Sequence, residues 1–111
     1  ARKIVMDLER IVASAHDVRE LRLLAALQGG RTRLPGALET EASRLVGGLG
    51  TALQARLGLE YEADEAEQRY LIADLLARWR EQAANPVLDQ DQRRAATVVV
   101  RSCEGMLSGL G

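Results

Sequence analysis

The stretch from Tyr61 to Asn85 constrains the fold most, because apolar residues recur in it at the spacing of an α-helix. Residues three and four positions apart lie on the same face of a helix. Two adjacent apolar lines result, one of Leu71, Leu75 and Trp79 and the other of Ile72, Leu76 and Ala83. A face of this width is typical of a helix that packs against more than one neighbour. Acidic residues precede it and Asn85-Pro86 ends it, so the pattern predicts a helix over about residues 63–84.

Four further helices are predicted from the same periodicity and from signals at their ends. Asp17 with Glu20, and Asp89 with Gln92, have the spacing of a capping box, in which side chain and backbone bond each other at a helix start. Gly29 follows the apolar pattern that begins near residue 18 and is expected to end that helix. The predicted helices cover about residues 3–15, 18–28, 35–57 and 90–108.

The segment 35–57 contains three glycines in its second half, Gly47, Gly48 and Gly50. The apolar stripe continues through them, so we expect one helix, bent at that point. Each glycine costs about 1 kcal/mol relative to alanine inside a helix, and such a glycine usually has a packing reason. Close approach of a neighbouring helix is the expected reason, and a hinge or a kink beside a ligand is the alternative. Pro35 is expected in the first turn, where its missing N–H costs nothing.

Short connections between the predicted segments favour neighbouring antiparallel helices. The fold class that follows is all-α, a compact bundle of about five helices. The helices predicted over residues 35–57, 63–84 and 90–108 are the long ones and are expected to form the core. A chain of 111 residues suits a single domain, residues 1–111. The core is expected to be aliphatic, because Phe is absent and aromatic residues make up 3% of the chain.

Composition excludes several classes of protein. An apolar content of 47% argues against disorder, and a net charge of −1 gives no overall field that would attract nucleic acid or an anionic membrane. Apolar runs such as Val98–Val100 are far too short to span a bilayer, and no retained signal peptide is recognisable. Cys103 is the single cysteine, which fits a reducing, cytoplasmic location. We therefore expect no nucleic-acid partner and no membrane partner.

Residue types that carry catalysis are sparse. A zinc site needs several Cys, His or carboxylate ligands at suitable spacing, whereas His16 and Cys103 are one of each and far apart. Cys103 lies on the predicted apolar face of its helix, where a buried, inert thiol is expected. The loop between Gly29 and Gly36 carries Arg31 and Arg33 but lacks the Lys-Ser/Thr of a phosphate-binding loop. No cofactor, no metal and no enzymatic activity are expected.

The densest group of charges is acidic and surrounds the start of the helix predicted over 63–84. Its members are Glu60, Glu62, Asp64, Glu65 and Glu67. Acids at a helix start are favoured by the helix dipole alone. A patch that docks a basic partner is one hypothesis for this group. A magnesium-dependent hydrolase is another, less favoured one, because Glu62 and Glu65 have the spacing of an ExxE pair but need a second carboxylate pair on a partner helix.

Residues 57–77, LGLEYEADEAEQRYLIADLLA, resemble the end of a PTS-regulation domain. In that family a helix ending in a Leu-Gly-Ile-like segment precedes a D-E pair and a helix containing Tyr-Leu. The matching positions here are Asp64-Glu65 and Tyr70-Leu71. Asp74 stands where the family has its phosphorylatable histidine, so phosphorylation at that position is not implied. The resemblance covers about a fifth of the chain, and it implies a helical domain of a bacterial regulator.

The function predicted from the sequence is a non-enzymatic helical protein-interaction or regulatory module that forms a homodimer. Helices 63–84 and 90–108 are expected nearest the two-fold axis, because their apolar faces exceed what a small core covers. The predicted interface residues are Trp79, Val98, Val99, Met106 and Leu110. The alternative is a ligand-binding helical domain whose pocket lies between the three long helices, near Gly47–Gly50 and Trp79. Arg93, Arg94 and Arg101 are interpreted as a solvated basic side of the last helix.

Overall fold

The computed structural model describes residues 17–110, in which five α-helices and no strand occur. Residues 111 and 1–16, with the helix predicted over 3–15 and His16, lie outside the described residues. The helices, in chain order, are α2 (Val18–Gln28), α3 (Ala37–Leu45), α4 (Leu53–Leu57), α5 (Glu65–Ala83) and α6 (Gln90–Gly109). The prediction of an all-helical fold is therefore confirmed for the described part of the chain.

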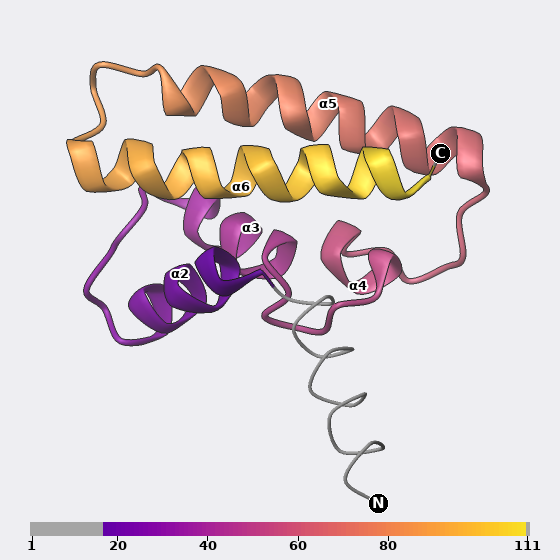
Figure 1. Cartoon of the computed structure of the whole chain (residues 1–111), viewed down its shortest axis with the longest axis horizontal. Coiled ribbons are helices and arrows are strands. Elements are labelled where there is room, and N and C mark those ends of the chain that lie inside the picture. The colour runs from indigo at the N-terminus through magenta and orange to yellow at the C-terminus, as the bar shows by residue number, and fades with distance from the viewer. Residues whose placement is uncertain (1–16, 111) are drawn as a thin grey trace, which may run out of the picture.

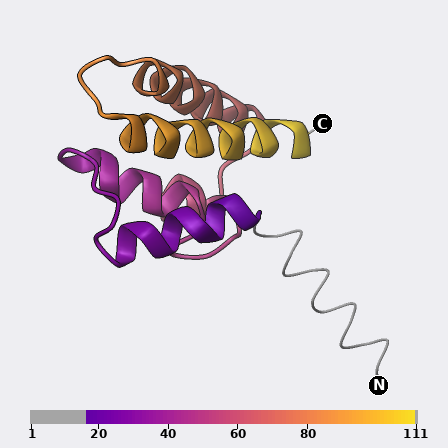
Figure 2. The same ribbon diagram turned by 60° about the vertical axis from the view of Figure 1, so that its left-hand side comes forward.

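Helix α6 lies in the middle of the molecule, with α5 along one side and the three shorter helices on the other (Figures 1 and 2). The α5 and α6 helices run antiparallel along almost their whole length and form the largest contact between two helices. Helices α2 and α3 both contact α6, and α3 also contacts α4. The two sides of α6 thus face different neighbours, which matters for the site described below.

The two long helices occur where the sequence predicts them. Asp64 caps α5 by accepting a hydrogen bond from the backbone N–H of Glu67, and Ala83 is its last residue. Asp89 and Gln92 form the predicted capping box at the start of α6. The face of α5 that packs on α6 buries Ile72, Leu75, Leu76 and Trp79. Both predictions are confirmed to within two residues at each end.

Helix α2 also starts with its predicted capping box, since the backbone N–H of Asp17 donates to Glu20 and the Asp17 carboxylate accepts from the first turn. The spacing of Val18, Leu21, Leu24 and Leu27 predicts an apolar stripe on this helix, and the prediction is confirmed only for Leu24, which is half-buried, and Leu27, which is buried. Val18 is 60% exposed and Leu21 is 45% exposed. The buried line consists of Glu20, Leu23 and Leu27, so an acidic side chain takes the place of the first apolar residue.

The single helix predicted over 35–57 is also wrong. It is replaced by α3 and α4, joined by a turn over residues 46–52. Gly47 has a φ of 93° and Gly50 a φ of 135°, which a helix does not tolerate and which glycine adopts without steric cost. Pro35 precedes α3 rather than standing in its first turn. In residues 17–110 the core is therefore built from two long helices and three short ones in place of three long helices.

The core is aliphatic around one tryptophan. Trp79 is 1% exposed, and its indole N–H donates to a carboxylate oxygen of Glu41 at 2.7 Å. Leu45, Val46, Ile72, Val99 and Cys103 are the other large side chains that are fully buried. None of the helices described for residues 17–110 is long and apolar enough to cross a membrane.

Candidate functional site

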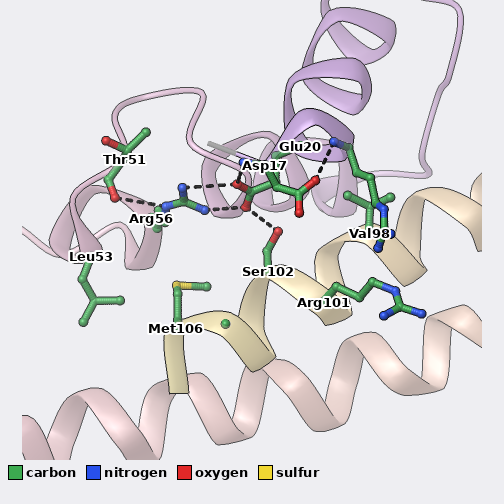
Figure 3. A pocket seen from close by; sticks show the side chains of 11 residues that line it. Asp17, Glu20, Thr51, Leu53, Arg56, Val98, Arg101, Ser102 and Met106 are labelled. Atoms are coloured by element: carbon green, nitrogen blue, oxygen red, sulfur yellow. Dashed lines mark hydrogen bonds and ion pairs between the residues drawn. The ribbon is translucent and has the colours of Figure 1, made fainter. Parts of the chain in front are cut away.

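A buried ion pair lies where α2, α4 and α6 meet (Figure 3). The Arg56 guanidinium on α4 donates to Glu20 on α2, with a shortest N···O distance of 2.6 Å. Both side chains are 8% exposed. The Ser102 hydroxyl on α6 donates to the same carboxylate at 2.5 Å. Three helices are thus joined through one acidic side chain.

Arg56 also fastens the turn that divides α3 from α4. Its guanidinium donates to the backbone carbonyl of Leu45, the last residue of α3, and to that of Thr51, each at 3.1 Å. The last carbonyls of a helix lack partners within it, so the bond to Leu45 satisfies a group that α3 leaves open, and the bond to Thr51 holds the end of the turn. Because the chain turns at Gly47 and Gly50, α4 lies close enough to α2 for Arg56 to contact Glu20.

The Glu20 carboxylate is held in its ionised form. Burial alone raises the pKa of this group, but hydrogen bonds from Arg56, Ser102 and the Asp17 backbone N–H, with the charge of Arg56, outweigh it, so the pKa lies below 4.5. Each carboxylate oxygen accepts two hydrogen bonds. A carboxylate whose oxygens already accept these hydrogen bonds holds its partners in place and is poorly suited to act as a general base toward a substrate.

Two neighbouring cavities lie beside this ion pair, between α2 and α6. The first measures about 470 Å³ and the second about 290 Å³, and Arg19 and Val98 line both. We call the two together the α2/α6 groove. The first cavity is lined by Asp17, Arg19, Glu20, Thr51, Leu53, Arg56, Val98, Arg101, Ser102, Gly105 and Met106. The second is lined by Arg19, Arg22, Leu23, Ala26, Thr32, Asp91, Arg94, Ala95 and Val98.

The groove is richer in cations than the chain as a whole. Five arginines line it, against the three acids Asp17, Glu20 and Asp91, although the net charge of the chain is −1. Glu20 is occupied by Arg56, and Asp91 lies 3.7 Å from Arg94. The groove therefore presents a net positive charge to a partner, above a floor that contains Val98 and Met106.

The predicted interface residues are divided between the core and this groove. Trp79 and Val99 are buried in the protein's own core, so neither is available to a partner in this conformation. Val98 and Met106 are half-buried and line the groove. Leu110 is half-buried at the end of α6, where its carbonyl accepts from Arg69. Trp79 lines neither cavity of the groove, so the space found here is not the ligand pocket predicted near Gly47–Gly50 and Trp79.

The acidic group does not converge on one point. Asp64 caps α5, Glu65 pairs with Arg69 at 2.8 Å, and Glu67 accepts from the Tyr61 hydroxyl at 2.5 Å. Glu60 and Glu62 are exposed, and their carboxylates pair with no side chain in residues 17–110. Within that range no three His, Cys, Asp or Glu side chains are placed to hold a metal ion.

Cys103 lies on the buried face of α6. Burial, with a smaller contribution from Glu41, raises the pKa of its thiol to about 12. The thiolate is the nucleophilic form of cysteine, so burial disfavours the reactive form of this side chain at neutral pH.

Two curated relatives match this chain, and both are isoniazid-induced protein IniC, one from Mycobacterium tuberculosis strain CDC 1551 / Oshkosh and one from strain ATCC 25618 / H37Rv. Each is 33% identical over 105 residues, which is 95% of this chain. The chain spans 21% of the length of these relatives. No protein-family model matches the chain, and no solved structure matches it significantly.

The ion pair is the part of the site that sequence reasoning missed. Glu20 and Arg56 are 36 positions apart, and no local pattern joins them. One signal was present, because Glu20 occupies the same helical line as Leu23 and Leu27, three and seven positions later. A charged residue on a buried line needs an oppositely charged partner, and Arg56 beside the core residue Leu57 was a candidate.

Proposed function

We propose that this chain is a non-enzymatic helical protein-interaction or regulatory module that self-associates, with the α2/α6 groove as its contact surface. The observation that carries the proposal is the groove itself. It combines half-buried apolar side chains, Val98 and Met106, with arginines at its edge. Arginine and Met are enriched in protein interfaces, and charged groups around an apolar centre favour specific contact.

The match to IniC shows that a region similar to this chain occurs within a larger protein. The matching region is a fifth of the length of IniC, so in that protein it is one part among others. A part of a larger protein has neighbours to contact, and a small helical unit with a grooved face is suited to that purpose. The name of IniC records induction by isoniazid and gives no partner, so the partner proposed here rests on the structure of this chain.

The test is the mass in solution as a function of concentration, measured by light scattering and sedimentation equilibrium. We expect association at micromolar concentration and its loss in Val98→Glu, which puts a carboxylate at the point shared by both cavities. Thr97→Glu is the matched control, because Thr97 is the exposed neighbour of Val98 on α6 and lines neither cavity. A wild-type mass of 12.1 kDa at every concentration would contradict the proposal. Circular dichroism of both variants establishes that they are folded.

A further inference from the structure

We infer that the α2/α6 groove binds the acidic segment Glu60–Glu67 of a second copy of this chain. The inference rests on the proposed function and specifies which two surfaces meet. Its basis is that the chain carries two exposed surfaces of opposite charge, each containing side chains with no partner among residues 17–110. Neither surface can be neutralised by the other in the same copy, because no residue of the acidic segment lines either cavity of the groove.

The cationic surface consists of arginines that folding leaves unpaired. Most arginines of residues 17–110 donate to a carboxylate or to a backbone carbonyl. The side chains of Arg19, Arg22 and Arg101 form no ion pair or hydrogen bond with any residue in that range. All three line the groove, Arg19 and Arg22 from α2 and Arg101 from α6. Figure 3 shows Arg101 and Val98 on the same stretch of α6.

The residues of α6 that line the groove lie along one side of the helix. Asp91, Arg94, Val98, Arg101 and Gly105 follow one another at intervals of three or four residues, so they share the face that looks onto the groove. A Cβ added at Gly105 would meet nothing within 4 Å, so the end of this line is open. The groove therefore offers the unpaired cations Arg19 and Arg22 on α2 and Arg101 on α6, together with apolar contact at Val98, and this combination suits a segment that carries carboxylates.

The acidic segment has the complementary chemistry. Glu60 and Glu62 are exposed and unpaired within residues 17–110, in the connection between α4 and α5. Tyr61 stands between them and is 52% exposed. Two free carboxylates with an exposed aromatic ring between them in the sequence supply charge for the arginines and apolar surface for the floor of the groove. In a dimer with two-fold symmetry this contact forms twice.

The inference is tested by reversing charge on each surface in turn. The groove variant carries Arg19→Glu and Arg101→Glu, and the segment variant carries Glu60→Lys and Glu62→Lys. All four side chains are exposed, so both variants are expected to fold. Each variant alone has two surfaces of like charge, and we expect its self-association to weaken by about a hundredfold or more, since like-charge contacts cost several kcal/mol. The control variant Arg31→Glu, Arg33→Glu has the same charge change as the groove variant at two arginines that line neither cavity.

Mixing the two variants provides the decisive measurement. In a mixed dimer, the acidic groove of the groove variant faces the basic segment of the segment variant. The native groove of the segment variant, which is basic, faces the native acidic segment of the groove variant. Both contacts therefore join opposite charges. We expect the mixture to form the dimer that neither variant forms alone, detected by sedimentation velocity with one variant labelled. We also expect wild-type association to weaken when ionic strength is raised from about 0.05 M to 0.5 M, because salt screens exposed charges.

The possible outcomes separate this inference from the proposed function. A wild-type protein that is monomeric at every concentration overturns both. A wild-type dimer with undiminished association in both variants overturns the inference and leaves the proposed function standing. Weakening of the groove variant alone would mean that another surface of the second copy fills the groove, and it overturns the role of Glu60–Glu67. Recovery of the dimer in the mixture and in no single variant supports the inference.

Discussion

The two sides of α6 are stabilised in different ways. Toward α5 the buried contact is mainly apolar, because Ile72, Leu75, Leu76 and Trp79 of α5 belong to the same core cluster as Ala96, Val99 and Cys103 of α6. Toward α2 and α4 the helix meets a buried ion pair, a serine hydroxyl and two cavities. A close-packed apolar contact stabilises through area removed from water. The other side depends on a few directional bonds and leaves space and charge exposed, which is the side suited to a partner.

The α5/α6 pair and the α2/α4 side are expected to respond differently to substitution. Loss of a methylene group from the apolar side costs burial and leaves a cavity. Loss of one member of the ion pair leaves a buried charge uncompensated, whereas loss of both is often nearly neutral. A second substitution therefore restores stability on the polar side, where it removes the other member of the ion pair, and is not expected to do so on the apolar side.

The largest effect is expected for Arg56→Met on the polar side. The substitution leaves the Glu20 carboxylate buried without its cation, and removing one partner of a buried pair costs about 3–5 kcal/mol. The free energy of unfolding by urea at pH 7 measures this loss.

The double variant Glu20→Gln, Arg56→Met is the matched control. Glutamine keeps the polar side chain at the third position of α2 and removes its charge, so the capping box is retained. We expect the double variant to be more stable than Arg56→Met alone. Equal losses in the two variants would show that the charge of Glu20 is not the cause, and that the bonds from Arg56 to Leu45 and Thr51 are.

On the apolar side, Leu75→Ala is expected to cost about 2–5 kcal/mol through lost burial and the cavity left behind. Leu75 is 6% exposed on the face of α5 that meets α6. The denaturation midpoint measures the effect, and Ala77→Gly on the exposed face of the same helix is the reference, with an expected cost of about 1 kcal/mol. An unchanged midpoint in Leu75→Ala would contradict the apolar packing described for this side.

Acid is expected to weaken the polar side selectively. The folded pKa of Glu20 lies below its ordinary value of 4.5, so its ionised form stabilises the fold above that pH, and the contribution is lost as pH falls through the folded pKa. Unfolding free energies measured between pH 7 and about pH 3 should fall less steeply in the double variant Glu20→Gln, Arg56→Met than in the wild type. Parallel curves would assign the acid sensitivity to other carboxylates.

A smaller effect, shared by both sides, is expected for Asp89→Ala. Asp89 accepts the backbone N–H of Gln92 at 2.8 Å at the start of α6, and loss of such a cap costs about 0.5–2 kcal/mol. Thermal unfolding followed by circular dichroism measures it. Asp89→Asn keeps a hydrogen-bond acceptor at that position and should retain most of the stability. If Asp89→Asn lost as much stability as Asp89→Ala, the charge of Asp89 rather than its hydrogen bond would be the cause.

The smallest effect is a gain of about 0.5–1 kcal/mol for Gly105→Ala, because alanine is favoured over glycine inside a helix and the added methyl group meets nothing within 4 Å. Ala96 provides the contrast, since it is fully buried on the opposite side of α6. Ala96→Leu should destabilise by about 1–3 kcal/mol through overpacking. The free energies of unfolding of the two variants show how much space each side of α6 leaves for an added side chain. A loss of stability in Gly105→Ala would contradict an open groove.

Most of the helical layout could be predicted from local patterns. The capping boxes at Asp17 and Asp89 and the stop at Asn85-Pro86 act over three or four residues, so they are visible in sequence. The break between α3 and α4 was missed, because an apolar stripe continues across it. The helix breaks because Gly47 and Gly50 adopt positive φ angles. Glycine permits such angles and does not require them, so the presence of glycine alone does not predict the break.

The site was harder to predict than the fold. The apolar character of Val98 and Met106 predicts them as interface residues, but the same pattern includes Trp79 and Val99, which are buried in the core. Helical spacing shows which residues share a face and gives no information on how much of that face a neighbour covers. The pairing of Glu20 with Arg56 depends on the turn between α3 and α4. A prediction of one continuous helix over residues 35–57 places Arg56 elsewhere, so the pair cannot be predicted from it.

The carboxylate of Glu20 has a mechanical consequence. One of its oxygens accepts the backbone N–H of Asp17, and the same group receives Arg56 and Ser102 from two other helices. Tension or rotation applied to the backbone at Asp17 therefore acts on α4 and α6 through short directional bonds, which break over small displacements, while the apolar contact with α5 lies on the far side of α6. A load applied at Asp17 reaches the bonds of Glu20 directly, whereas the paired long helices are connected to that point only through α6.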